Sequence, residues 1–113
     1  MRPLYHPPVS EITVAGIMHA LSDPVRVKIF MQLRDTDGDE CGVNCSTFLR
    51  VGRIDLPKST LSQHFKILRE AGLIRSERKG VELQNYTRCT ELKASFGPLI
   101  EAIVRAYARE LKK

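Results

Sequence analysis

The chain has 113 residues, of which 42% are hydrophobic and 27% are charged, and its formal net charge is +5. This length suits a single domain, and the composition is too apolar for a disordered chain. No apolar run approaches the roughly 18 residues of a membrane span, and the N-terminus lacks the apolar stretch of a signal peptide, so we expect a cytoplasmic protein with no membrane partner.

The N-terminal third predicts an arm followed by two helices. Residues 1–11 contain several prolines and are expected to form an extended arm, and residues 12–113 are expected to form one domain. Asp23 followed by Pro24 is typical of a helix start, because aspartate caps an amide and proline suits the first helical position. The apolar positions at helical spacing are Val14, Ile17, Met18 and Leu21 before this start, and Val25, Ile29, Phe30 and Leu33 after it.

An acidic loop is predicted at residues 35–40, which hold Asp35, Asp37, Asp39 and Glu40 and no base. The pattern of residues 41–56 is weak. Phe48, Leu49 and Val51 are compatible with a short helix there.

A strongly patterned helix follows at about residues 58–70. At 100° per residue, Leu61, Phe65 and Leu68 fall within about 60° of one another and predict a buried stripe. Gly72 is expected at the C′ position that ends the helix, where glycine adopts a left-handed conformation. The opposite side of the helix is polar and holds Ser59, Ser62, Gln63, Lys66 and Glu70.

A hairpin and a last helix complete the predicted fold. The strand-like segments 73–78 and 83–89 flank a turn at Lys79-Gly80. A helix is expected to open at Phe96-Gly97-Pro98, with apolar positions at Leu99, Ile100, Ile103, Tyr107 and Leu111. The predicted fold class is mainly α with a small β-hairpin, arranged α-α-α-α-β-β-α as in a winged helix-turn-helix.

The polar helix and the hairpin together indicate duplex DNA as a partner. The major groove admits one helix, whose side chains read base edges, and Gln63 can bond adenine through two hydrogen bonds while Ser59, Ser62 and His64 can make single bonds. The bases Lys66, Arg75, Arg78 and Lys79 suit phosphates. The alternative is an amphipathic surface helix with an ordinary polar face.

The charge distribution bears on the same question. Residues 58–93 hold eight lysines and arginines against four acids, whereas residues 35–40 are acidic. Such a basic segment is either one of two solvated faces of opposite sign or the footprint of nucleic-acid binding.

Two motifs resemble the ArsR-type (arsenic-repressor) family of winged-helix regulators. They are Ala20-Leu21-Ser22-Asp23-Pro24-Val25-Arg26 and the run from Lys58 to Ile74, KSTLSQHFKILREAGLI. The resemblance implies a homodimer built on the first and last helices, and repression that a chemical signal relieves. It also places Ser59, Thr60, Ser62, Gln63 and His64 against DNA, although the position of His64 equally allows packing or a backbone bond. The predicted DNA-binding set is Lys58, Ser59, Thr60, Ser62, Gln63, His64, Lys66, Arg75, Arg78 and Lys79.

The three cysteines are an odd number, which argues against a disulfide framework. Cys41 and Cys45 are spaced more widely than the cysteine pair of the family's metalloid sensors, and the last helix lacks the histidine ligands of its zinc sensors. Three interpretations stay open: inert thiols, a site for a thiophilic metal or metalloid ion, and a thiol–disulfide switch. Cys89 is a possible third thiol.

Two other classes of function compete with a DNA-binding regulator. An enzyme is not expected, because the sequence has no glycine-rich phosphate loop, no serine elbow and no carboxylate pair near a histidine. A winged helix that contacts RNA or protein without an inducer is the second alternative.

Overall fold

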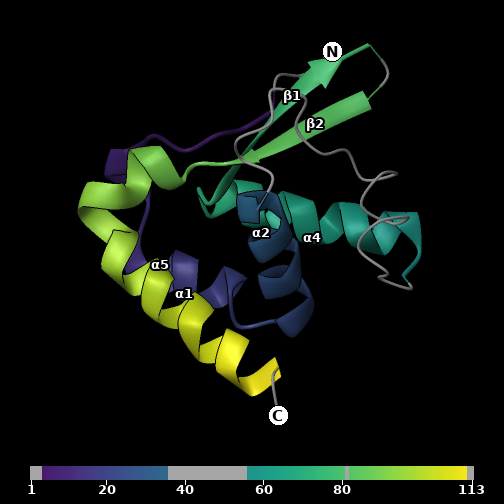
Figure 1. Ribbon diagram of the computed structural model, residues 1–113. Coiled ribbons are helices and arrows are strands. Elements are labelled where there is room, and N and C mark those ends of the chain that lie inside the picture. The colour runs from purple at the N-terminus through teal and green to yellow at the C-terminus, as the bar shows by residue number, and fades with distance from the viewer. Residues whose placement is uncertain (1–3, 36–55, 81, 112–113) are drawn as a thin grey trace.

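The computed structural model describes residues 4–35, 56–80 and 82–111 (Figure 1). The predicted fold class is confirmed, because among the described residues three α-helices precede a two-stranded antiparallel hairpin and one follows it. Cys41, Cys45 and the short helix predicted within residues 41–56 lie outside the described residues. The elements are η1 (Val9–Glu11), α1 (Val14–Ala20), α2 (Pro24–Asp35), α4 (Lys58–Glu70), β1 (Ile74–Lys79), β2 (Glu82–Thr87) and α5 (Cys89–Leu111).

Helices α1 and α2 begin at side-chain caps. Thr13 Oγ1 accepts a hydrogen bond from the Gly16 amide at 3.0 Å, so α1 starts directly after Thr13. Asp23 Oδ1 accepts from the Val25 amide at 2.8 Å, and this bond confirms the predicted start of α2. Each such cap satisfies a backbone amide that the helix itself leaves without a partner, and stabilises the helix by about 1 kcal/mol.

Helix α2 lies at the centre of the core and contacts α4, β2 and α5. Ile29, Phe30 and Leu33 are buried as predicted, but Val27 is also fully buried and was not on the predicted apolar face. A helix that packs against neighbours on several sides buries more than one stripe, so a single-face pattern underestimates its burial.

The wing, by which we mean the β1–β2 hairpin, follows the recognition-type helix α4 directly. Its strands pair with Ile74 opposite Thr87 and Lys79 opposite Glu82. Gly80 has a φ of 66° in the turn between them, which confirms the predicted turn. The Arg88 amide donates to the Leu73 carbonyl at 2.9 Å and ends the ladder.

Two predictions about α5 are wrong. The helix begins at Cys89 and not at Phe96, so Cys89 starts a helix and does not end a strand. Leu92 is fully buried, and its packing keeps the first turns helical although Pro98 lies inside the helix and has no amide hydrogen to donate. Figure 1 shows that α5 changes direction in its N-terminal half.

The described part of the N-terminal arm, residues 4–11, packs against the domain next to Ile12. Residues 4–8 form neither helix nor strand, and the backbone of Pro8 is extended. Val9–Glu11 form a 3-10 turn and not the extended chain that was expected there. Pro7 and Ile12 are buried. The Ile12 side chain lies directly against Gly72, at the junction of α4 and β1.

Candidate nucleic-acid interface

Helix α4, here called the recognition helix, is held to the core by the predicted stripe. Leu61 and Leu68 are fully buried and Phe65 is 2% exposed. The helix ends in a Schellman motif, because Leu73 N–H donates to Leu68 O at 3.0 Å and Gly72 has a φ of 89°. Both the buried stripe and the C′ glycine are therefore confirmed.

The polar side of the recognition helix faces solvent. At 100° per residue, Ser59, Ser62, Gln63 and Lys66 span an arc of about 100° opposite the buried stripe. The major groove admits one α-helix, so a polar face of this kind can be presented to base edges there. Seven residues of the recognition helix were predicted to contact DNA. Apart from His64 they are all exposed: Lys58, Ser59, Thr60, Ser62, Gln63 and Lys66.

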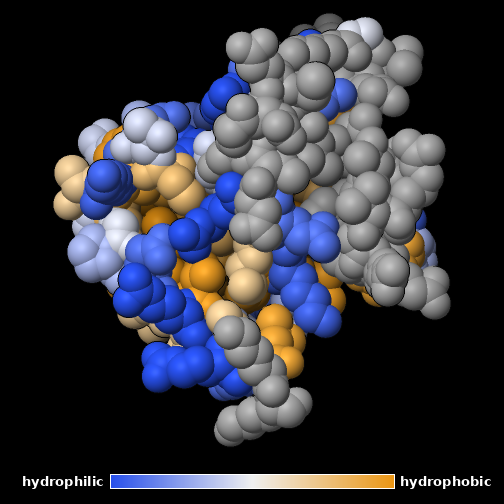
Figure 2. All heavy atoms as spheres, viewed as in Figure 1, coloured by the Kyte–Doolittle hydropathy of each residue, from blue (hydrophilic) through white to orange (hydrophobic). Residues whose placement is uncertain are grey.

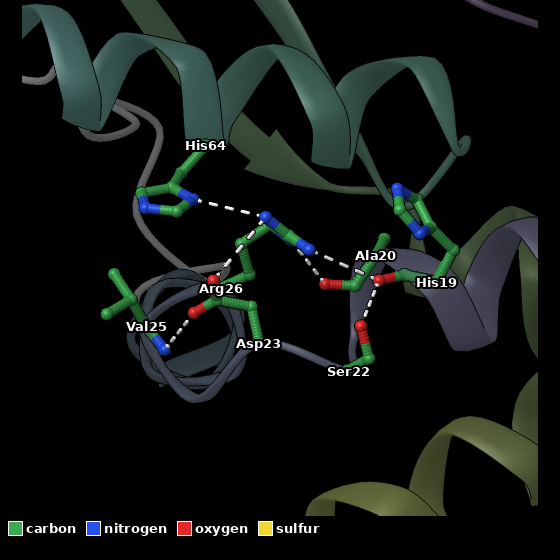
Figure 3. A network of polar contacts seen from close by, with 7 residues as sticks. All are labelled: His19, Ala20, Ser22, Asp23, Val25, Arg26 and His64. Carbon is green, nitrogen blue, oxygen red and sulfur yellow. Dashed lines mark hydrogen bonds and ion pairs between the residues drawn. The ribbon is translucent and has the colours of Figure 1, made fainter.

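His64 lies apart from this exposed face and is half-buried. Its Nδ1 atom is 3.3 Å from Nη1 of Arg26, a residue of α2 (Figure 3). The structure thus places His64 on the flank of the helix that faces α2, and it bonds a side chain there. Arg26 was quoted as part of a motif, but its contact with the recognition helix was not predicted.

The basic residues of the wing are not equivalent. The Arg75 guanidinium lies 4.2 Å from the centroid of the Tyr86 ring and is ion-paired with Glu77. Arg78 is exposed, and successive strand residues point to opposite faces, so Arg75 and Arg78 lie on different faces of the wing. Lys79 is the last residue of β1, next to the turn. Since Glu77 already partners Arg75, Arg78 is the better candidate for a phosphate contact.

A buried polar cluster connects the wing to the recognition helix and to the arm. Ser76 Oγ donates to Asn85 Oδ1 at 2.7 Å and accepts from Arg69 Nη1 at 3.2 Å. The Ser76 amide donates to Nε2 of His6 at 3.0 Å. Burial and the positive charge of Arg69 hold the pKa of His6 below its ordinary value. The lowered pKa favours the neutral form of His6, which is the form whose Nε2 can accept this hydrogen bond.

The arm has a second attachment close by. Arg88, which is 6% exposed, donates from Nη1 to the Pro7 carbonyl at 2.7 Å and pairs with Glu91 at 2.8 Å. The arm is thus attached to both edges of the wing's base. This cluster was not predicted, because its residues lie in separate parts of the sequence and follow no local pattern.

Thiols and metal ligands are not gathered in the part of the chain that the structure describes. No group of three His, Cys, Asp or Glu side chains there could hold a metal ion. Cys89 is half-buried at the start of α5 and lines a mainly apolar hollow with Pro98 and Ile100. Among the same described residues, no helix is both long and apolar enough to cross a bilayer.

This arrangement defines the class of protein. A helix with a buried apolar stripe and an exposed polar face precedes a β-hairpin, as in a winged helix-turn-helix. A family model described as a helix-turn-helix domain matches residues 21–77, from the end of α1 into β1. The chain belongs to this family, and its resemblance to the ArsR-type regulators is confirmed.

The chain is also similar to a curated regulator, the HTH-type transcriptional repressor SmtB of Mycobacterium tuberculosis, from strains CDC 1551 and H37Rv. In both comparisons 37% of the residues are identical over 78 residues, which is 68% of this chain and 53% of the relative. The chain therefore spans about half the length of the curated relatives it matches.

Proposed function

We propose that this protein is a sequence-specific DNA-binding regulator that represses transcription as a homodimer. The observation that carries the proposal is the exposed face of the recognition helix. Ser59, Ser62, Gln63 and Lys66 line it, and no apolar residue interrupts them. Repression is supported by the similarity to proteins named transcriptional repressors.

The wing supports DNA as the partner. Its exposed Arg78 lies on the same hairpin that follows the recognition helix, so both elements can meet one duplex, with the helix in the groove and the wing on the backbone. If the polar side of the recognition helix were only a solvated face, there would be no reason for a basic hairpin to follow it.

The test of DNA recognition begins by selecting bound duplexes from a random pool. The selected duplex, a scrambled duplex and an RNA duplex of the same sequence are then titrated at one salt concentration. A sequence-specific regulator prefers the selected duplex by about 10³-fold or more over the scrambled one. Equal affinity for all three would contradict the proposal, and a preference for the RNA would support the alternative class.

The homodimer is proposed to form through α1 and α5. Ile17 of α1 and Leu21, which directly follows this helix, are buried as predicted, but the other predicted apolar residues of α1, Val14 and Met18, are 49% and 55% exposed. Leu111 of α5 is 54% exposed, and Figure 2 shows hydrophobic atoms beside α5, whose outer side in this view is mostly hydrophilic. A second copy would cover this surface, and a two-fold dimer would place two recognition helices on one operator.

Met18→Asp tests this contact, because Met18 is exposed in one subunit and a charge there does not disturb the core. We expect the variant to sediment as a folded monomer and to lose tight operator binding. Lys28→Asp on α2 is the control, since Lys28 is exposed outside the proposed contact. A Met18→Asp variant that remains dimeric would place the interface elsewhere.

The signal is proposed to act on Cys41 and Cys45, either by ligation of a thiophilic metal or metalloid ion or by oxidation. Thiolates are the ligands that soft ions prefer and the form that oxidants attack. The test compares release of the wild-type protein from DNA by arsenite, zinc and oxidant with release of the Cys41→Ser/Cys45→Ser variant. If both proteins respond alike, the two thiols are inert.

A further inference from the structure

Arg26 of α2 is a buried charged residue that caps the end of α1. It is 8% exposed, and its Nε atom donates to the Ala20 carbonyl at 2.7 Å. Its Nη2 atom donates to the His19 carbonyl at 3.3 Å. The last carbonyls of a helix have no partner within it, so Arg26 supplies donors that α1 lacks.

The remaining nitrogen of the same guanidinium faces the recognition helix. Nη1 lies 3.3 Å from His64 Nδ1 and 3.7 Å from Asp23 Oδ2 (Figure 3). A guanidinium only donates, so a hydrogen bond at this contact requires His64 Nδ1 as the acceptor and the ring hydrogen on Nε2.

This contact sits on one flank of the buried stripe. His64 lies about 60° to one side of Leu61, and Arg69 lies about 80° to the other. Arg69 bonds Ser76 Oγ at 3.2 Å. Burial of the apolar stripe decides which side of the helix faces the core. Hydrogen bonds are directional, so the two flanking bonds narrow the rotation of the recognition helix that this burial still allows.

We propose that Arg26 is a positioning residue for DNA recognition, which fixes the recognition helix against the end of α1 through His64 Nδ1. His64 then serves this contact and does not read a base. The inference rests on the proposed function, because rotation of the helix decides where Ser62 and Gln63 meet the groove. Since α1 is part of the proposed dimer contact, Arg26 also helps to position the recognition helix relative to the recognition helix of the second subunit.

Two substitutions at His64 test which ring nitrogen matters. Asparagine places an acceptor near the position of Nδ1, and glutamine places a donor near that of Nε2. We expect His64→Asn to keep operator affinity within about threefold and His64→Gln to lose about tenfold or more, with affinity for scrambled DNA unchanged in both. The reverse order would mean that His64 reads DNA through Nε2. Equal effects of the two substitutions would also overturn the proposal.

A measurement without DNA separates this inference from the proposed function. Nitrogen NMR of the labelled imidazole should show His64 protonated at Nε2 and unprotonated at Nδ1, and Arg26→Gln should produce a mixture of tautomers. An Nδ1–H form in the folded wild-type protein would refute the contact, whatever the DNA result. If the stated tautomer is found and no duplex is bound, the contact stands and its role in DNA recognition falls with the proposed function.

Discussion

Gly72 joins the recognition helix to the wing in a conformation that only glycine adopts readily. Its φ is +89°, and a Cβ atom there would lie 2.4 Å from Ile12 Cδ1 and 2.5 Å from Ile12 Cγ1. We expect Gly72→Ala to lower the free energy of unfolding by about 2–4 kcal/mol. About 1–2 kcal/mol comes from the left-handed backbone and about 1–2 kcal/mol from displacing the buried Ile12 side chain.

Two further variants separate these contributions. Gly80→Ala carries the backbone cost alone, because Gly80 has a φ of +66° and a Cβ there would meet nothing within 4 Å. We expect it to cost about 1–2 kcal/mol. In the double variant Ile12→Ala/Gly72→Ala the clash is gone, so its cost should be about 1–2 kcal/mol less than the summed costs of Gly72→Ala and the single variant Ile12→Ala.

Urea unfolding of all variants at one protein concentration is the assay, because the stability of a dimer depends on concentration. If the slope of the free energy of unfolding against urea concentration is the same for all variants, they unfold from the same native state. The reasoning would be refuted if Gly72→Ala and Gly80→Ala cost the same and the double variant were simply additive. Ile12 would then not pack against Gly72.

Four other predictions concern base recognition, the wing, the N-terminal arm and the thiols. Gln63→Ala should cost about 1–3 kcal/mol on the selected operator and much less on scrambled DNA, whereas equal losses would show that Gln63 does not read sequence. Arg78→Ala should weaken binding to every duplex and reduce the slope of log affinity against log salt by about one unit, and an unchanged slope would separate the wing from the phosphates. Since the pKa of His6 is lowered in the folded protein, the stability that its neutral form contributes should be fully present above about pH 6.5 and be lost as the pH falls. Urea unfolding at about pH 7.5 and about pH 5.5 should therefore differ less for His6→Gln than for the wild type. Finally, Cys41→Ser/Cys45→Ser should still bind DNA but fail to respond to a thiophilic ion, while a normal response would identify the thiols as inert.

The sequence alone determined those features that depend on neighbours within one or two turns. The spacing of Leu61, Phe65 and Leu68 predicted the buried apolar stripe. Gly72 indicated the end of the helix, and Gly80 indicated the turn of the hairpin. These features are local because a helix repeats every 3.6 residues and a positive φ is a property of one residue. The exposed reading face follows from the same periodicity, since it is the side of the helix opposite the stripe.

Tertiary structure decided where partners come from distant segments. Local rules favoured a helix start near Pro98, but burial of Leu92 extends α5 back to Cys89. The sequence position of His64 allowed either a base contact or packing, and only the fold brings Arg26 to its Nδ1 atom, across 38 residues. A hydrogen bond over that separation leaves no periodic trace in the sequence, because it depends on how α2 and α4 cross in the core.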